Sequence, residues 1–157
     1  MKRLTAATLA LSALVFGSSV LVGQSRASSG ARVSFVCSAA DKQFISTVST
    51  NMFQLGYWSD ALLHHDVVAD VVVKQARAES AQVDATRPQD RTLHATRDLL
   101  SSMFLEYSKA VSAPAGGDAR RHMQAAWGLA NASHQLLLGA KDGLARQGCD
   151  VSPLISA

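Results

Sequence analysis

The sequence predicts an all-α protein: an up-down-up-down four-helix bundle, closed by one disulfide bond and preceded by a cleaved N-terminal signal peptide. Three observations favour this fold. From residue 38 onward, apolar residues recur at the spacing of amphipathic helices, and no strand-type alternation is visible. Pro88 and the segment "APAGGD" (residues 113–118) separate the periodic segments. Two cysteines lie near the two ends of the domain, where an even number of helices would bring them together.

The first 27 residues have the composition of an export signal. A basic start, "MKR", precedes the apolar stretch "LTAATLALSALVFGSSVLVG", and "SRA" supplies small residues near Ala27. A retained membrane anchor is the alternative, but small polar residues interrupt the stretch, which is barely long enough to cross a bilayer. We therefore expect cleavage near Ala27, one domain over residues 28–157, no stable membrane anchor after cleavage, and a secreted or periplasmic (cell-envelope) location.

Removal of the signal balances the charge of the chain. The whole sequence has 15 basic and 12 acidic residues, but Lys2, Arg3 and Arg26 belong to the signal. Taking these three from the 15 leaves 12 basic residues against 12 acidic ones. The mature protein therefore has no basic excess of the kind that nucleic-acid binding requires, and we expect no nucleic-acid partner.

Cys37 and Cys149 are predicted to form a disulfide bond. In an oxidising compartment an even pair of cysteines most simply pairs, and neither residue lies in a CxxC motif or beside a histidine. A free reactive thiol and a thiolate metal ligand are the alternatives. Closing a loop of this length stabilises the folded state by about 4–5 kcal/mol in the chain-entropy account.

Two helices are expected before Pro88, over residues 38–63 and 67–85, with Asp66 as the N-cap of the second. The second has an apolar start at its valines, and its pattern then weakens. Glu79 falls on its apolar stripe, which indicates either a buried acid with a raised pKa or a loosely packed, hydrated half-helix; we favour the second. The stripe of the first helix consists of Phe44, Ile45, Val48, Met52, Leu55, Leu62 and Leu63.

Two further helices are expected over residues 90–112 and 119–146, with Asp118 capping the last and Gly148 ending it. With four helices, the start of the first and the end of the fourth lie at the same end of the bundle, which agrees with the predicted disulfide. The third stripe consists of Leu93, Leu99, Leu100, Met103, Phe104, Tyr107 and Val111, and the fourth of Met123, Ala126, Ala130, Leu137, Ala140 and Leu144.

Three histidines are expected to converge at the end of the bundle opposite the disulfide: His64, His65 and His122. Neutral imidazole binds haem iron and transition metals, and carboxylates orient it or complete the ligand shell. The candidate haem or transition-metal site therefore also includes Tyr57, Asp66 and Asp70. A solvated helix end is the alternative and the one we favour, because "HHD" also suits a turn and histidine suits a helix C-terminus.

Phe53, Tyr57 and Trp58 form a candidate interaction surface on the first helix. Phe53 and Tyr57 share a face away from the main apolar stripe, with Trp58 on its flank. The ridge either packs against a neighbouring helix or contacts a partner. Exposure of these rings would support interaction, and burial would assign them to the core.

The two ends of the domain resemble small secreted haem-carrying proteins of actinobacteria. The resemblance covers a cysteine just past the signal, an all-helical body and a late cysteine followed by "DVSPLIS". It implies haem binding through tyrosine and histidine, which correspond here to Tyr57 and to His64 or His65.

The sequence contains no motif that specifies a reaction: no HExxH, no GxSxG and no SxxK. We therefore expect a non-enzymatic binding or interaction protein whose partner is an unidentified protein or small ligand, with a homodimer as a further option. An extracytoplasmic carrier of haem or a transition metal is the alternative, and an enzyme whose residues form no known motif is a third.

Overall fold

The structure of the protein is a computed structural model that describes residues 36–156. These residues form four long helices and one short one, with no strand among them. The all-α prediction and the four long helices are thus confirmed, whereas the predicted signal peptide, residues 1–27, lies outside the described residues. The helices are α1 (Ala39–Leu63), α2 (Ala69–Ala85), α3 (Arg91–Ser112), α4 (Gly117–Arg146) and the short α5 (Ser152–Ile155).

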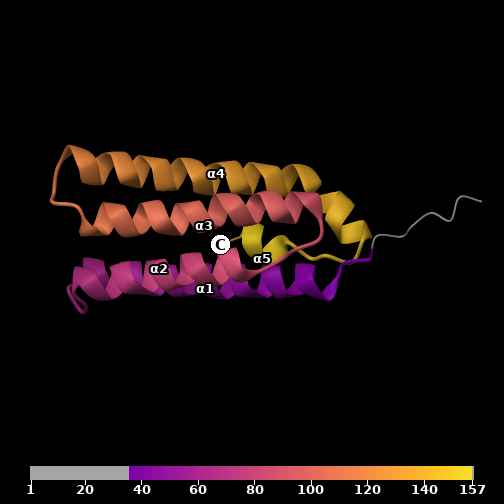
Figure 1. Cartoon of the computed structure of the whole chain (residues 1–157), viewed down its shortest axis with the longest axis horizontal. Helices are drawn as coiled ribbons and strands as arrows, with labels where there is room; N and C mark the ends of the chain where they lie inside the picture. The colour runs from indigo at the N-terminus through magenta and orange to yellow at the C-terminus, as the bar shows by residue number, and fades with distance from the viewer. Residues whose placement is uncertain (1–35, 157) are drawn as a thin grey trace, which may run out of the picture. The chain divides into compact units, whose positions relative to one another are not determined.

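The four long helices lie side by side, and the chain passes from each to the next at alternate ends (Figure 1). Each long helix packs against the next one along the chain, whereas α1 and α4 have no pair of Cα atoms within 8 Å. The short α5 lies between α1 and α4 at the disulfide end and contacts both. The bundle is therefore open between α1 and α4 beyond α5. The core is formed by Phe44, Val48, Val72, Val83, Leu93, Phe104, Leu137 and Val151, among others.

The predicted disulfide is confirmed and joins the two ends of the domain. Cys37 and Cys149 are bonded, both are buried, and 112 positions of sequence separate them. Beside the bond, the backbone N–H of Cys37 donates to the carbonyl of Gln147 at 2.7 Å. The segment before α1 is therefore held to the end of α4 by one covalent and one hydrogen bond.

A buried aspartate, Asp41, fixes the start of α1. Ser38 and Asp41 form a reciprocal capping box, in which each side chain accepts from the backbone N–H of the other residue. The other carboxylate oxygen of Asp41 accepts from the backbone N–H groups of Gln89 at 2.7 Å and Asp90 at 3.0 Å. Burial alone would raise the pKa of Asp41, but these hydrogen bonds outweigh it and lower the pKa below its usual value. One carboxylate thus connects α1 to the α2–α3 loop.

The C-terminus of α1 is closed by a Schellman motif in which a histidine is the left-handed residue. The N–H of His65 donates to the carbonyl of Leu62, and that of Asp66 donates to the carbonyl of Ala61. His65 has φ 61°, a left-handed conformation in which glycine is more usual. The same motif ends α4, where Gly148 has φ 83° and occupies the equivalent position, as predicted.

Two predicted N-caps are wrong. Asp66 is used in the Schellman motif of α1, so α2 begins only at Ala69, with Val68 as an N-cap that has no side-chain hydrogen bond. Asp118 lies inside the first turn of α4 because Gly116, with φ 154°, is the N-cap. The carboxylate of Asp118 still favours the helix start through its charge.

The apolar stripes were predicted well except at the end of the bundle opposite the disulfide. Leu63 at the end of α1 is 78% exposed, and Met123 near the start of α4 is 44% exposed. At the start of α2, the N-cap Val68 and the helical Val71 are exposed while Val72 is buried. These side chains lie at the end of the bundle where no further helix covers them.

Candidate functional site

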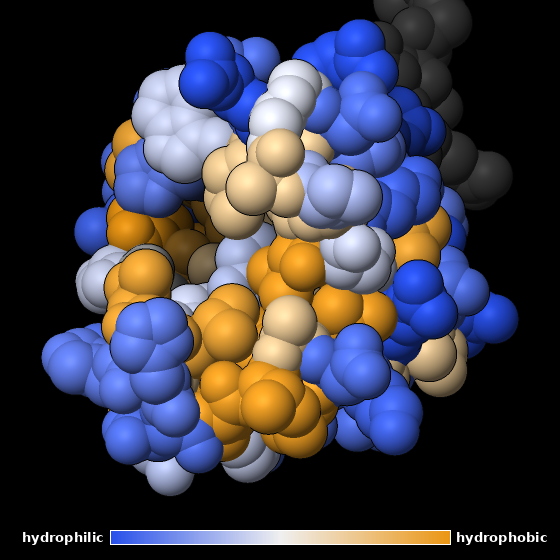
Figure 2. All heavy atoms as spheres, turned by 90° about the vertical axis from the view of Figure 1, so that its left-hand side faces the viewer, coloured by the Kyte–Doolittle hydropathy of each residue, from blue (hydrophilic) through white to orange (hydrophobic). Residues whose placement is uncertain are grey.

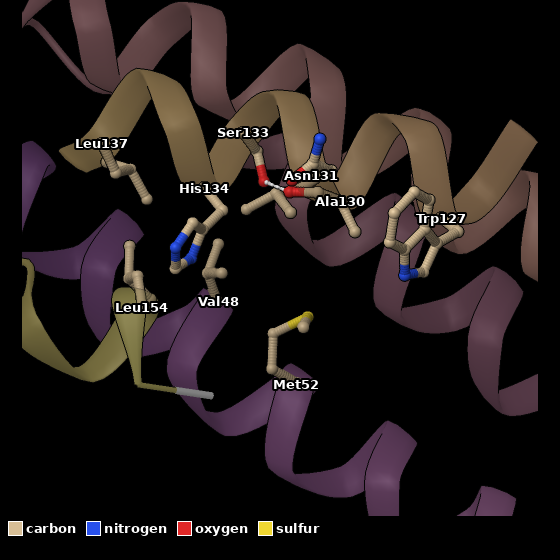
Figure 3. Close-up of a pocket in the computed structure, with 10 residues that line it drawn as sticks. Val48, Met52, Trp127, Ala130, Asn131, Ser133, His134, Leu137 and Leu154 are labelled. Atoms are coloured by element: carbon tan, nitrogen blue, oxygen red, sulfur yellow. Dashed lines mark hydrogen bonds between the residues drawn. The ribbon is translucent and has the colours of Figure 1, made fainter. Parts of the chain in front are cut away.

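The open side of the bundle forms an apolar groove between α1 and α4. Val48 and Met52 of α1 form one wall, and Leu100 of α3 and Leu154 of α5 also line the cavity, which has a volume of about 240 Å³. Figure 3 shows Val48 and Met52 of α1 and Trp127 and His134 of α4 extending into the space between the helices. The wall on α4 consists of Trp127, Ala130, Asn131, Ser133, His134 and Leu137.

The positions on α4 follow the helical repeat. Trp127 and His134 are seven residues apart, with Ala130 between them, so they lie along one face of the helix. At 1.5 Å of rise per residue, Trp127 and His134 are separated by about 10 Å along the axis. The groove therefore has an elongated lining with an aromatic ring toward one end and an imidazole nearer α5.

His134 is the titratable side chain in the lining of this groove. Its half-buried ring points from α4 into the space between α4 and α1 (Figure 3). Among the lining residues, Ser133 Oγ donates a hydrogen bond to the carbonyl oxygen of Ala130 at 2.8 Å. Figure 3 marks this bond and shows none between His134 and the other lining residues. The imidazole therefore retains its hydrogen-bonding capacity toward the cavity, whereas the hydroxyl of Ser133 is already used.

A second hollow lies on the outer side of α1 and meets the groove at Met52. It is bordered by Phe53 and Tyr57 of α1 and by Pro153 of α5. Phe53 is 78% exposed and Tyr57 62% exposed. Trp127, across the groove, is 72% exposed. Figure 2 views the bundle from the end opposite the disulfide and shows apolar side chains gathered around a recess in the surface.

The predicted ridge on α1 is thus exposed at two of its three positions. Trp58 is half-buried, and its ring meets that of Tyr57 edge-on, with centroids 5.2 Å apart. Neither Phe53 nor Tyr57 is a core residue. Their exposure excludes the alternative in which both rings pack into the core.

His64 and His65 directly follow the last residue of α1, at the far end of the bundle. His64 is exposed, and its Nδ1 lies 2.9 Å from the carbonyl oxygen of Asp60, one turn earlier. His65 is exposed at the left-handed position. Asp66 and Asp70, predicted as ligands, are exposed as well. These residues have the geometry of a helix end.

His122 pairs with an acid of the neighbouring helix. Its Nδ1 lies 2.7 Å from Oε2 of Glu106, whose other oxygen accepts from Lys109 Nζ at 2.6 Å. The hydrogen bonds from Lys109 and then from His122 lower the pKa of Glu106. This cluster connects α3 to α4, and Nδ1 of His122 is engaged by Glu106.

No ligand set for a metal includes the predicted histidines in the described part of the chain. Within residues 36–156, the one group of three ligand-type side chains close enough to share an ion is Cys37, Asp41 and Cys149. Its two sulfur atoms are bonded to each other and its carboxylate is hydrogen-bonded to backbone, so this group does not provide three free donors. The predicted metal ligands therefore do not lie close enough to one another in the described residues to share an ion.

Glu79 is fully buried, and the interpretation of this half of α2 as loosely packed and hydrated is wrong. Its Oε1 accepts from Gln75 Nε2 at 3.1 Å, and that amide also reaches Gln54 of α1 at 3.3 Å. Asn51 donates to the backbone carbonyl of Glu79 at 3.3 Å, while Oε2 of Glu79 has no partner within the described residues. Burial raises the pKa of Glu79 to about 7, partly offset by the bond from Gln75.

Comparison with models of protein families, with curated proteins and with solved structures finds no match to this chain. The resemblance to actinobacterial haem carriers therefore gains no support from these comparisons. Within the described residues, no helix combines the length and apolar character needed to cross a membrane.

Sequence reasoning did not find the groove. It assigned no role to His134 or to Trp127. The signal was present in the spacing, because Trp127 and His134 form an i, i+3, i+7, i+10 series with Ala130 and Leu137 of the main stripe of α4. Which neighbour such a series faces depends on tertiary packing.

Proposed function

We propose that this protein is a non-enzymatic, extracytoplasmic binding protein that holds an apolar ligand in the groove between α1 and α4. The observation that carries the proposal is the separation of α1 from α4, which leaves an apolar, elongated cavity open on the flank of the bundle. Sites for small ligands are concave, largely apolar and supplied with few polar groups. The groove has this composition, with Asn131, Ser133 and His134 as its polar residues on α4.

The surroundings of the groove support the same function. Phe53, Tyr57 and Trp127 are large exposed rings on the two helices that border it. Large apolar side chains grouped on a surface are typical of binding sites. They provide a surface on which an apolar ligand can first make contact.

Export is part of the proposal. The disulfide between Cys37 and Cys149 favours an oxidising compartment. Together with the predicted signal at residues 1–27, it supports a protein that acts outside the cytoplasm as an up-down-up-down bundle. Expression with and without residues 1–27, followed by fractionation, tests this part: retention of the full chain inside the cell would contradict it.

The binding function is tested with an environment-sensitive apolar dye such as anilinonaphthalene sulfonate. The oxidised protein should increase the fluorescence of the dye, and Ala130→Phe, which fills the groove, should remove most of that increase. Ala132→Phe is the matched control, because residue 132 is exposed on the same helix outside the groove lining. Equal dye binding by both variants would show that the dye does not enter the groove.

An extracytoplasmic haem carrier is the second candidate, and one observation favours it within the same groove. The thioether of Met52 and the imidazole of His134 extend from opposite walls (Figure 3). Methionine and histidine are a known pair of axial haem ligands. The cavity of about 240 Å³ is smaller than the ~300–1,000 Å³ typical of drug-sized ligands, so α1 would have to move to admit a porphyrin.

A haemin titration distinguishes the two haem sites. If haem binds in the groove, His134→Ala should abolish the Soret shift of the parent protein. If it binds at the helix end, the triple variant His64→Ala, His65→Ala, His122→Ala should abolish it. No Soret shift in the parent protein would exclude both versions and leave the apolar-ligand proposal standing.

A further inference from the structure

We propose that the ligand of the α1–α4 groove is a single-chain amphiphile with a carboxylate head, a medium-chain fatty acid. Its carboxylate accepts a hydrogen bond from His134, and its chain lies along the groove toward Trp127. This inference rests on the proposed function, because it assigns a ligand class to the same groove.

The size of the groove favours a slender ligand. Its volume of about 240 Å³ lies between the ~150 Å³ of an engineered cavity that holds benzene and the ~300–1,000 Å³ of pockets for drug-sized molecules. The distance of about 10 Å from His134 to Trp127 along α4 makes the cavity long for its volume. One extended hydrocarbon chain suits this shape better than a compact ring system does.

The lining favours an apolar chain over a polar one. Between His134 and Trp127 the chain would pass Ala130, which leaves room because its side chain is small, and Met52 on the opposite wall. The unbranched thioether of Met52 adapts to an irregular neighbour. The indole of Trp127, now 72% exposed, would be covered by the end of the chain.

The charges of the lining favour an anionic head. None of the residues that line the cavity is an aspartate or a glutamate. An imidazole N–H donates to a carboxylate oxygen whether the ring is neutral or protonated. Asn131, three residues before His134, is exposed, and its amide nitrogen points away from the space between the helices (Figure 3), so His134 is the head-group donor. A cationic head would meet no acid here.

The test is competition against the apolar dye by three ligands of equal chain length: decanoate, decan-1-ol and decylammonium. Each is titrated into the oxidised protein below its micelle-forming concentration. We expect decanoate to displace the dye at a concentration about tenfold lower than decan-1-ol, because hydrogen bonds to charged groups are the stronger ones. Decylammonium should be the weakest competitor.

Variants separate the head-group site from the groove. His134→Ala should bring decanoate and decan-1-ol to equal competition, and His134→Gln, which keeps an N–H donor, should restore part of the difference. His94→Ala on α3 is the matched control, since His94 is exposed and lies outside the groove lining. Far-UV circular dichroism of each variant verifies that it is folded.

The outcomes distinguish this inference from the proposed function. Dye binding that Ala130→Phe blocks, combined with no preference for decanoate, overturns the fatty-acid inference and leaves the groove as an apolar site. A preference for decanoate that survives His134→Ala overturns the assigned head-group contact. No dye binding in the parent protein overturns the proposed function itself.

Discussion

Replacing Glu79 by glutamine should remove most of the pH dependence of stability between pH 5 and pH 8. Glu79 is fully buried between helices, one of its oxygens accepts from Gln75, and the other has no partner in the described chain. Burial raises its pKa from 4.5 to about 7. The native state therefore holds a proton at pH values where the unfolded chain has already released it. Because the unfolded state then binds fewer protons, the free energy of unfolding falls as the pH rises through this window.

The size of the effect follows from the two pKa values. At 1.36 kcal/mol per pKa unit, the change from 4.5 to about 7 corresponds to a loss of about 3 kcal/mol once the pH is well above 7. Between pH 5 and pH 8 we expect a decrease of about 2–3 kcal/mol in the free energy of unfolding. This is a large part of the stability of a small domain. Asp41, whose pKa is lowered, acts in the opposite sense and only at more acidic pH.

Urea unfolding followed by far-UV circular dichroism at pH 5 and pH 8 measures this difference. The parent protein should lose stability at pH 8, and Glu79→Gln should show little change between the two values. Asp84→Asn is the control, because Asp84 is an exposed acid on the same helix. Equal stability of the parent at both pH values, or the same pH dependence in Glu79→Gln, would refute the assignment of a buried, protonated Glu79.

Three further predictions concern the frame that positions the groove. Asp41→Ala should lower the free energy of unfolding by about 2–4 kcal/mol in urea titrations, because the variant leaves the N–H groups of the α2–α3 loop without their acceptor. A loss below ~0.5 kcal/mol would show that water fully replaces the carboxylate as acceptor. His65→Gly should raise stability by up to about 1 kcal/mol, since glycine adopts the left-handed conformation without steric cost, and a clear loss would contradict that conformation. Reduction of the Cys37–Cys149 bond, or the double replacement by serine, should cost about 4–5 kcal/mol, and an unchanged melting temperature would show that the bond has no structural role.

Most of the secondary structure was predictable because local sequence determines it. Helical periodicity identified the four long helices, and Pro88 and Gly148 marked boundaries that the structure confirms to within a few residues. The predicted N-caps at residues 66 and 118 were wrong because the backbone of neighbouring residues determines where α2 and α4 begin. The Schellman motif of α1 already used Asp66, and Gly116 started α4 early. Short α5 carried no periodic signal and was missed.

The candidate site was less predictable because it depends on how the helices pack. Periodicity shows which face of α4 is apolar, but it does not show that α1 stays away from α4 and leaves part of that face open. The prediction for Glu79 was wrong for a similar reason. An acid on an apolar stripe was interpreted as hydrated, yet Asn51, Gln54 and Gln75 provide it with a polar seam inside the bundle.

The central claim is that a ligand enters the groove between α1 and α4, and the fluorescence of Trp127 tests it most directly. The chain has two tryptophans, so Trp58→Phe leaves Trp127 as the only reporter. Trp127 is 72% exposed at the rim of the groove and should emit as a largely hydrated indole in the free protein. Titration with decanoate should shift its emission to shorter wavelength and saturate, and Ala130→Phe in the same background should abolish the saturable shift. Decanoate that binds by calorimetry without changing the emission of Trp127 would contradict the claim.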